Sequence, residues 1–179
     1  MFHAPVRPGV ELRLIEERHA HVQFNLVDRE REQLRLWLPW VDATRSEDDI
    51  LAFTRRTLEQ FASNAGFAAA VWEHGKLAGV IGTHNINWLY RKAEIGYWLA
   101  REFQGRGLMT DACRAVVKHL LVEMDLNRVE IHCACRNEKS RAIPRRLGFT
   151  LEGTLREAQL LNGEFLDLEV YGMLRRELR

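Results

Sequence analysis

The chain has 179 residues, of which 46% are hydrophobic and 28% are charged, and its formal net charge is +1. This length suits one domain with a substantial core and is too short for two of comfortable size, so we treat residues 1–179 as a single domain. The near-neutral charge, with acidic and basic residues interspersed, argues against nucleic acid or an anionic membrane as a partner.

The cysteines and the amino-terminal segment indicate the cellular compartment of the protein. Cys113, Cys133 and Cys135 are an odd set without CxxC spacing, so they predict no disulfide framework and favour a reducing compartment. The opening segment MFHAPVRPGVELRLIEE has no apolar core of signal-peptide length, and no later stretch approaches a membrane span. We therefore expect a cytoplasmic protein that makes no use of a membrane.

The first third of the chain predicts one strand and two helical regions. Apolar residues at every second position predict a strand over 10–16. Residues 18–38 are helical in character, and the proline of the following run LWLPW interrupts any helix there. Ser46 and Asp49 form a capping-box pattern, which predicts a helix that continues to a stop at 64–66.

The middle of the chain predicts a three-strand meander followed by a helix. Residues 67–73, 74–76 and 77–87 are typical of a strand, a tight turn and a strand, and a third strand is expected over 93–100. Apolar residues with a period of 3.6 predict an amphipathic helix over 108–124.

The last third predicts a strand, a short helix and a long hairpin. The strand covers 128–135, and the helix covers 138–147. Pro144 favours a late start for this helix, because proline fits only the first turn. The dipeptide Asn162–Gly163 between two alternating segments is the strongest short signal for a hairpin.

These elements predict an α+β protein with about seven strands. The strands on either side of helix 108–124 are joined by a helical crossover, so they should be parallel neighbours, while the others can pair antiparallel. We expect a mixed, twisted sheet with helices on both faces, in an α/β/α layered arrangement.

Two glycines, Gly105 and Gly107, flank Arg106 between a predicted strand and a predicted helix. The N-terminus of a helix leaves N–H groups unpaired and carries partial positive charge, and glycines before it let a phosphate approach the backbone. No P-loop or complete dinucleotide fingerprint is present. From the residues alone, this segment is either an anion-binding loop or a plain connector.

The segment QGRGLM (104–109) resembles the Q/R-x-x-G-x-G/A acetyl-CoA loop of the GCN5-related N-acetyltransferase (GNAT) superfamily, with Met109 in the last position. Further segments are similar to its RimJ/RimL branch, which includes enzymes that acetylate the N-terminal amine of ribosomal proteins. They are KAEIGYWLAREFQGRGLMT (92–110), LNRVEI (126–131), NEKSRAIPRRLGF (137–149), EG (152–153) and LNG (161–163).

The resemblance implies acetyl-CoA as cosubstrate, with no metal, and a splayed parallel strand pair whose gap receives the pantetheine. The implied pantetheine contacts are the backbone groups of Trp98, Leu99 and Ala100. The implied pyrophosphate loop is Gln104, Gly105, Arg106, Gly107, Leu108, Met109 and Thr110. A backbone N–H near Leu99 would stabilise the thioester oxyanion.

Direct acetyl transfer requires the acceptor ammonium to lose a proton and the leaving thiolate to gain one. The resemblance places Asn137 and Ser140 near the cofactor sulfur and gives Ser140 the role of general acid; the tyrosine acid of many superfamily members is replaced by Pro144. From the residues alone, Asn137 or Ser140 could instead cap the short helix.

The general base is less well defined. The position that carries a glutamate in the ribosomal stalk-protein enzyme is Gln159, which does not accept a proton at neutral pH. We select Glu94, on the cofactor-binding strand, although it could instead form an ion pair with Lys92 or Arg91. Weaker choices are Glu157 and His84. Relayed water could also suffice, because the pKa of a free N-terminal amine is only about 8.

Three further features each have two interpretations. Trp37, Pro39 and Trp40 could line the acceptor groove or belong to the core. A basic cluster could meet the 3′-phosphate of CoA or be solvated; it comprises Arg136, Lys139, Arg141, Arg145 and Arg146. The sequence HCAC at 132–135 contains metal-binding residue types, but strand alternation places His132 opposite the two cysteines.

The resemblance thus implies an acetyl-CoA-dependent N-acetyltransferase that works by direct transfer, without a covalent enzyme intermediate. The implied acceptor is the α-amine of a protein N-terminus, such as that of a ribosomal protein. The alternatives are a small amine (a polyamine, an aminoglycoside or an amino-acid derivative) and a non-catalytic acetyl-CoA-binding module. Relatives form homodimers, so we expect a homodimer, and neither charge nor motif supports nucleic-acid binding.

Overall fold

The computed structural model describes residues 3–178, apart from the side chain at position 85, and within them eight strands form one sheet. The strands are β1 (His3–Arg7), β2 (Val10–Leu14), β3 (Ala68–Glu73), β4 (Lys76–Asn87), β5 (Lys92–Leu99), β6 (Arg128–Ala134), β7 (Thr150–Leu161) and β8 (Glu164–Leu174). The α-helices are α1 (Ala20–Arg29), α2 (Arg31–Leu34), α3 (Glu47–Ala62), α4 (Leu108–Lys118) and α5 (Glu138–Leu147). Single turns of 3-10 helix occur at Glu17–His19, Val41–Ala43, Arg101–Phe103 and Arg175–Glu177.

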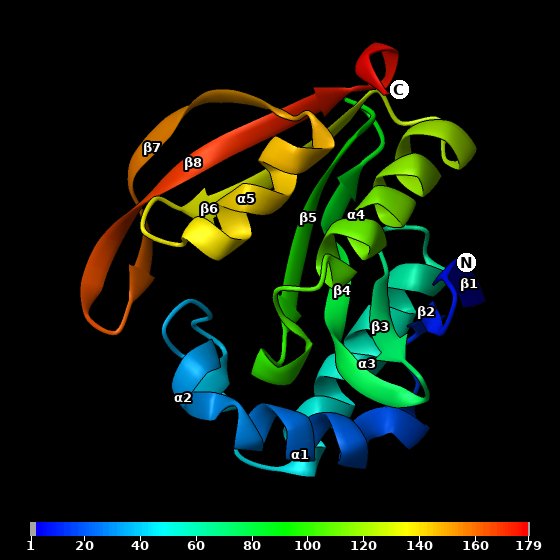
Figure 1. Cartoon of the computed structure of the whole chain (residues 1–179), viewed down its shortest axis with the longest axis vertical. Coiled ribbons are helices and arrows are strands. Elements are labelled where there is room, and N and C mark those ends of the chain that lie inside the picture. The colour runs from blue at the N-terminus through cyan, green and yellow to red at the C-terminus, as the bar shows by residue number, and fades with distance from the viewer. Residues whose placement is uncertain (1–2, 179) are drawn as a thin grey trace.

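The sheet has the strand order β1-β2-β3-β4-β5-β6-β8-β7, and only β5 and β6 pair in parallel. Helices α4 and α5 cover one face, and α1 and α3 cover the other (Figure 1). The predicted α+β fold, with a mixed sheet between helical layers, is therefore confirmed. No helix within residues 3–178 is long and apolar enough to cross a membrane.

The prediction of about seven strands missed β1. This strand is short, contains Pro5 and has mostly exposed or half-buried side chains, so it lacks the alternating apolar pattern of a half-buried strand. Proline is tolerated in β1 because the strand lies at the edge of the sheet, where an N–H can face solvent.

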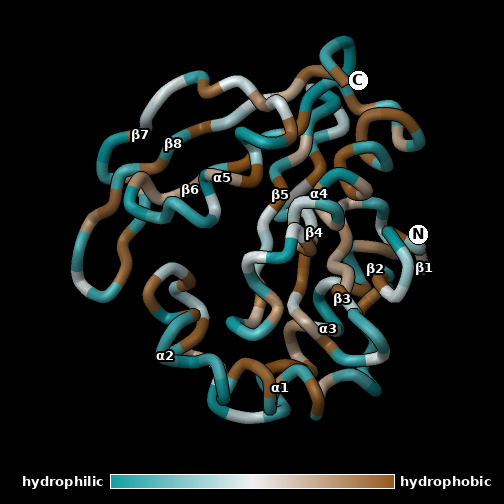
Figure 2. Tube along the Cα trace, viewed as in Figure 1, coloured by the Kyte–Doolittle hydropathy of each residue, from teal (hydrophilic) through white to brown (hydrophobic). Residues whose placement is uncertain are grey.

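The core lies mainly between the sheet and α4. Hydrophobic stretches run along β3, β4 and β5 (Figure 2). Side chains that are almost completely buried there include Leu12, Ile81, Ile95, Leu108 and Leu120. The apolar stripe of α4 therefore fixes this helix on the sheet, as its predicted periodicity indicated.

Local signals predicted several helix boundaries. Ser46 accepts a hydrogen bond from the N–H of Asp49, whose carboxylate accepts one from the N–H of Ser46, so the capping box that begins α3 is confirmed. The helix predicted over 108–124 is interrupted, because α4 ends at Lys118 and a π-helical turn follows over His119–Glu123.

The carboxy-terminal elements follow the prediction except at Pro144. The late start that Pro144 suggested is wrong: α5 covers Glu138–Leu147, so the proline lies inside the helix. The predicted hairpin is confirmed, with Asn162 and Gly163 both left-handed (φ 51° and 83°), as a type I′ turn requires.

A buried ion pair attaches α5 to β8. Arg141 donates from Nε to Oε2 of Glu169 over 2.7 Å, and the Tyr171 hydroxyl also donates to Glu169. The side chains of Arg141 and Glu169 are only 14% and 10% exposed. The hydrogen bond from Arg141 lowers the pKa of Glu169 below its ordinary value.

We predict that Glu169→Gln lowers the free energy of unfolding by about 2 kcal/mol at pH 7, because Arg141 then loses its buried charged partner and keeps only the exposed Glu138. Since folding lowers the pKa of Glu169, its stabilising effect is present above the unfolded pKa of about 4.3 and is lost as the pH falls through the folded value. Urea unfolding of wild type and variant at several pH values measures this. Glu164→Gln, on the exposed start of β8, is the control. A difference that stays constant from pH 7 to pH 3.5 would contradict the prediction.

Candidate functional site

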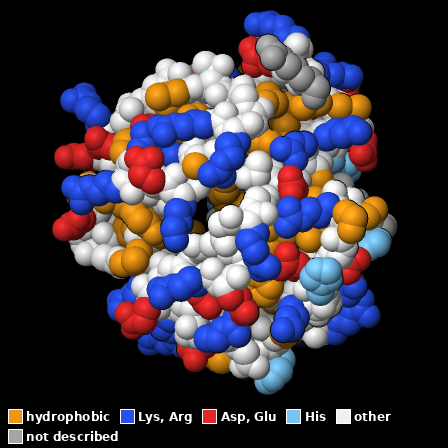
Figure 3. Space-filling model, viewed as in Figure 1, with side chains coloured by type: hydrophobic (Ala, Val, Ile, Leu, Met, Phe, Trp, Pro, Cys, Tyr) orange, Lys and Arg blue, Asp and Glu red, His pale blue; other side chains and the backbone are white. Residues whose placement is uncertain are grey.

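A gap opens where β5 and β6 part. The two strands pair only over Lys92–Glu94 and Arg128–Glu130, and beyond these residues β5 remains bonded to β4 and β6 to β8. Figure 1 shows the strands starting together and diverging along their length, and Figure 3 shows a hollow between them, bordered by Lys and Arg side chains. The inner edge of β5 therefore lacks a neighbouring strand over its second half.

The backbone of Leu99 faces this gap. The N–H of Ala100 donates to the Ala78 carbonyl over 2.9 Å, and its carbonyl accepts from the Phe103 N–H over 3.0 Å. Because backbone groups alternate in direction along a strand, the peptide groups of Leu99 point the other way, into the gap. The Leu99 carbonyl accepts a hydrogen bond from Nε2 of Gln104 over 2.9 Å.

Of the three expected backbone contacts in β5, only Leu99 directs its peptide groups into the gap. The N–H and carbonyl of Ala100 are engaged by Ala78 and Phe103. The Trp98 carbonyl faces β4, because a Cβ on Gly79 would lie 2.2 Å from its oxygen. Trp98 instead contributes its ring, whose centroid is 6.1 Å from that of Trp40. The pantetheine contacts themselves stay a prediction.

The glycine loop leaves room for an anion at the start of α4. Gly105 and Gly107 are both left-handed, with φ values of 78° and 74°, and Gly107 is the N-cap residue of α4. A Cβ on Gly105 would meet nothing within 4 Å, and one on Gly107 would meet only Nη1 of Arg7 at 3.9 Å. This open space before the first helical turn suits a phosphate, and the anion-binding interpretation of the loop stays a prediction beside that of a plain connector.

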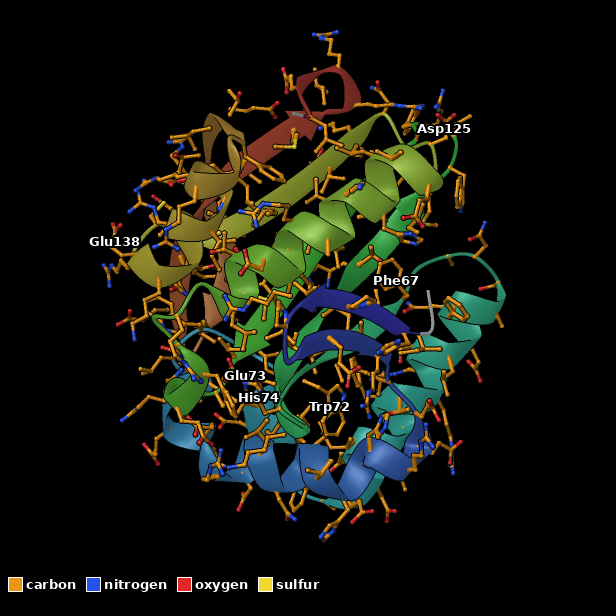
Figure 4. The ribbon with its side chains drawn as sticks, turned by 45° about the vertical axis from the view of Figure 1, so that its right-hand side comes forward. Phe67, Trp72, Glu73, His74, Asp125 and Glu138 are labelled. Carbon is orange, nitrogen blue, oxygen red and sulfur yellow. The ribbon has the colours of Figure 1, made fainter. Side chains whose placement is uncertain are left out.

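Side chains from distant strands hold the outer side of this loop. Arg106 lies 2.7 Å from the carboxylate of Glu73, at the end of β3 (Figure 4). Arg7 in β1 donates to the Arg106 carbonyl over 3.2 Å and to Asp111 over 2.8 Å. The N-terminal strand missed by the sequence prediction thus supports the loop, and no local signal indicated this contact.

The basic cluster predicted from the sequence divides in two. Nζ of Lys139 donates to Oε1 of Gln104 over 2.8 Å, and Arg146 donates to the buried Thr110 hydroxyl over 3.4 Å. These two cations lie beside the loop, where phosphate groups would bind. Arg141 and Arg145 instead face Glu138 (Figure 4) and Glu169, so they are structural.

Ser140 reaches the gap from the first turn of α5. Asn137 caps this helix by accepting from the Ser140 N–H over 3.1 Å, which confirms the capping interpretation for Asn137. The Ser140 hydroxyl lies 3.2 Å from the Cys133 sulfur and 3.5 Å from the Tyr97 hydroxyl. Burial raises the pKa of both Tyr97 and Cys133, so both stay protonated and neutral near pH 7.

Glu94 occupies the last paired position before the gap, on the opposite face of β5 from Tyr97. Its carboxylate lies 3.8 Å from Nε2 of His84 and 3.6 Å from Nδ1 of His132. The ion pairs suggested for Glu94 are wrong, because Lys92 and Arg91 bind other carboxylates, Lys92 that of Glu130 and Arg91 that of Asp125 (Figure 4). His132, which the sequence analysis weighed only as a metal ligand, thus joins an acid–base cluster.

The remaining candidates lie on the hairpin and beside the aromatic residues. Glu157 is exposed and left-handed, and its N–H donates to Oδ1 of Asp167 over 2.8 Å. Gln159 is half-buried and pairs with Leu166. Trp40 is 36% exposed and is not a core residue, and its ring lies beside that of Trp98 in β5. Among the described residues, no group of three or more His, Cys, Asp and Glu side chains could hold a metal ion.

Residues 10–150 match the acetyltransferase (GNAT) domain. The chain belongs to the GNAT acetyltransferase family. It is 39% identical to YdaF, a putative ribosomal N-acetyltransferase of Bacillus subtilis (strain 168), over 99% of this chain and 97% of the relative. It is 31% identical to the ribosomal-protein-serine acetyltransferase of Escherichia coli (strain K12), over 94% of each. The structure of RimL, a ribosomal L7/L12 α-N-protein acetyltransferase, in complex with coenzyme A has a TM-score of 0.94 and 29% identity, covering 96% of this chain and 97% of that one.

This GNAT acetyltransferase is an enzyme that uses acetyl-CoA as acetyl donor. The observed geometry fits that cosubstrate: the glycine loop has room for a pyrophosphate, and the N–H of Leu99 lies on an edge without a neighbouring strand, which suits an amide-containing chain. The resemblance found in the sequence is confirmed at the level of family and fold.

We predict that Gly107→Ala raises the Kd for acetyl-CoA at least about tenfold, because a methyl group would enter the anion cradle. Unfolding should become easier by about 1 kcal/mol, since alanine is strained at this positive φ. Titration calorimetry and urea unfolding measure the two effects.

Gly75→Ala is the matched control, because Gly75 has nearly the same φ (77°) and equally open surroundings but lies in the β3–β4 turn. It should lose the same stability and keep the wild-type Kd. Equal Kd values for the two variants would contradict the assignment of the loop.

Proposed function

We propose that this acetyltransferase transfers an acetyl group directly from acetyl-CoA to the N-terminal α-amine of a protein, and that the protein is ribosomal. The observation that carries this proposal is the match over nearly the full length to enzymes named for ribosomal proteins. A half-length match would leave the acceptor-binding elements outside the comparison, whereas this match includes α1, α2 and the β7–β8 hairpin.

The two substrates would approach from opposite faces of the sheet. The glycine loop, Ser140 and the phosphate-side cations lie on the face of α4 and α5. Glu94, Trp98 and Trp40 lie on the face of α1 and α3. Asn162, in the hairpin turn, donates to the Arg35 carbonyl over 3.0 Å and so closes one end of the acceptor side. The gap between β5 and β6 connects the two faces.

Ser140, Glu94 and Leu99 have separate tasks in this proposal. Acetyl-CoA supplies an activated acetyl thioester. The Leu99 N–H is directed into the gap and would donate to the carbonyl oxygen as negative charge develops on it. The Ser140 hydroxyl would protonate the departing thiolate, and Glu94 would accept the proton of the amine, directly or through water.

We also propose a homodimer, a cytoplasmic location and one acetyltransferase domain over 1–179. The β7–β8 hairpin carries Leu151, Leu155, Leu160 and Phe165, each between 48% and 63% exposed, and β7 is an edge strand. An apolar edge of this kind suits a second copy of the chain. Light scattering that gives a monomer mass at all concentrations would exclude the homodimer.

The free thiols of all three cysteines suit a reducing compartment, and one continuous sheet suits one domain.

An acceptor panel tests the proposed function. The purified protein is mixed with acetyl-CoA and one acceptor, and a thiol reagent measures the CoA that is released. The acceptors are peptides that begin with a free serine or alanine, spermidine, and an aminoglycoside. We expect the peptides to give the highest kcat/KM, and the same peptides with a blocked N-terminus to give none. Faster turnover of a small amine would favour the small-molecule alternative. Tight acetyl-CoA binding without turnover of any amine would favour a binding module.

Ser140→Ala should lower kcat at least about tenfold and leave the Kd for acetyl-CoA within about twofold of wild type, because only a proton donor is lost. Ser140→Thr keeps a hydroxyl and should retain most of the activity. Single-turnover acetylation of the best peptide measures the chemical step. Wild-type kcat in Ser140→Ala would remove Ser140 from the mechanism.

Glu94→Gln should lower kcat at least about tenfold, because an amide cannot accept the proton of the amine. Initial rates between pH 5 and pH 9 measure the effect. Glu123→Gln, on the exposed turn after α4, is the control. A profile of the same shape and height as wild type would show that Glu94 is not the base.

A further inference from the structure

Pro144 leaves a hydrogen-bond acceptor unused inside α5. In an α-helix each N–H donates to the carbonyl four residues earlier, so residue 144 would normally bond to the carbonyl of Ser140. Proline has no N–H, and its ring also presses on that carbonyl. Pro144 is buried and lies inside the helix, so the Ser140 carbonyl needs another donor.

Tyr97 supplies the missing donor from across the gap. Its hydroxyl donates to the Ser140 carbonyl over 3.1 Å, and the Ser140 hydroxyl lies 3.5 Å from the same phenol oxygen. Burial raises the pKa of Tyr97 well above its ordinary value, so the phenol keeps its proton and remains a donor through the neutral range.

This contact matters because few others join β5 to α5. Parallel pairing between β5 and β6 has already ended at Glu94 and Glu130, so no backbone ladder fixes α5 relative to the open edge at Leu99. A second hydrogen bond, from Lys139 of α5 to Gln104 in the loop after β5, joins side chains that are exposed or half-buried. The Tyr97 contact is more buried and therefore more restrictive.

We propose that Tyr97 is a positioning residue: its hydroxyl replaces the amide that Pro144 lacks, and thereby holds the Ser140 hydroxyl at a fixed place beside the Leu99 edge. The proposal rests on the proposed role of Ser140 as proton donor. Tyr97 need not touch either substrate for this task. A displacement of about 1 Å in such a group can cost about a hundredfold in rate, so holding one helix turn has a catalytic effect.

A double-mutant cycle tests the inference. Tyr97→Phe removes only the hydroxyl, and we expect kcat to fall about tenfold while the KM for acetyl-CoA changes less than about twofold. Pro144→Ala alone should have little effect on kcat. In Tyr97→Phe, however, adding Pro144→Ala should recover most of the lost kcat, because the new N–H at residue 144 can donate to the Ser140 carbonyl. Tyr90→Phe, at a tyrosine that is 67% exposed, is the matched control.

The outcomes separate this inference from the proposed function. If Tyr97→Phe keeps wild-type kcat, or if Pro144→Ala fails to restore any of the loss, the positioning role is overturned. The Tyr97→Phe change should also lower kcat no further in a Ser140→Ala background, because no hydroxyl remains to be placed. If Ser140→Ala is fully active, the acid assignment fails by itself. The urea midpoints of wild type, Tyr97→Phe, Pro144→Ala and the double variant then still test the coupling. If Tyr97 and Pro144 are linked through the Ser140 carbonyl, the effects of the two changes on stability are not additive.

Discussion

The early end of the hydrogen-bonded pairing between β5 and β6 is the constraint on which the rest of the site depends. The pairing stops at Glu94 and Glu130, and from there each strand is held by its other neighbour. The inner edge of β5 consequently carries backbone groups without a strand partner, and such groups require something else to bind. Because β4 and β8 still support the outer edges, the gap stays open without unfolding either strand.

The gap also decides how α5 is held. On the side of β8 the helix is attached by the buried pair of Arg141 and Glu169, so this one arginine of the basic segment has a structural partner. On the side of β5 it is attached by side chains alone, chiefly through the Tyr97 hydroxyl. Helix α5 is thus held toward β8 by a buried ion pair and toward β5 by a few specific hydrogen bonds. This arrangement separates fold stability from the placement of the proposed proton donor.

Strand alternation places the polar and aromatic side chains of β5 on both faces of the sheet. Tyr97 points toward Ser140 and Cys133, whereas Glu94 and Trp98 point to the opposite face, toward the histidines and Trp40. The proposed acceptor and acetyl-CoA would therefore meet in the gap without sharing an entrance. In the proposed mechanism the acid and the base approach the reacting atoms from opposite faces of the sheet.

The sequence by itself determined the features whose causes are local. The capping pair Ser46 and Asp49 and the hairpin turn at Asn162–Gly163 act through neighbouring residues, so spacing and residue type were enough. For the loop glycines the residues alone left two interpretations. The tertiary structure decided the rest. The contact of Tyr97 with Ser140, the grouping of Glu94 with His132 and the support of the loop by Arg7 join residues far apart in the chain. Such contacts depend on how strands and helices distant in the chain pack together, and a pattern among neighbouring residues carries no information about that.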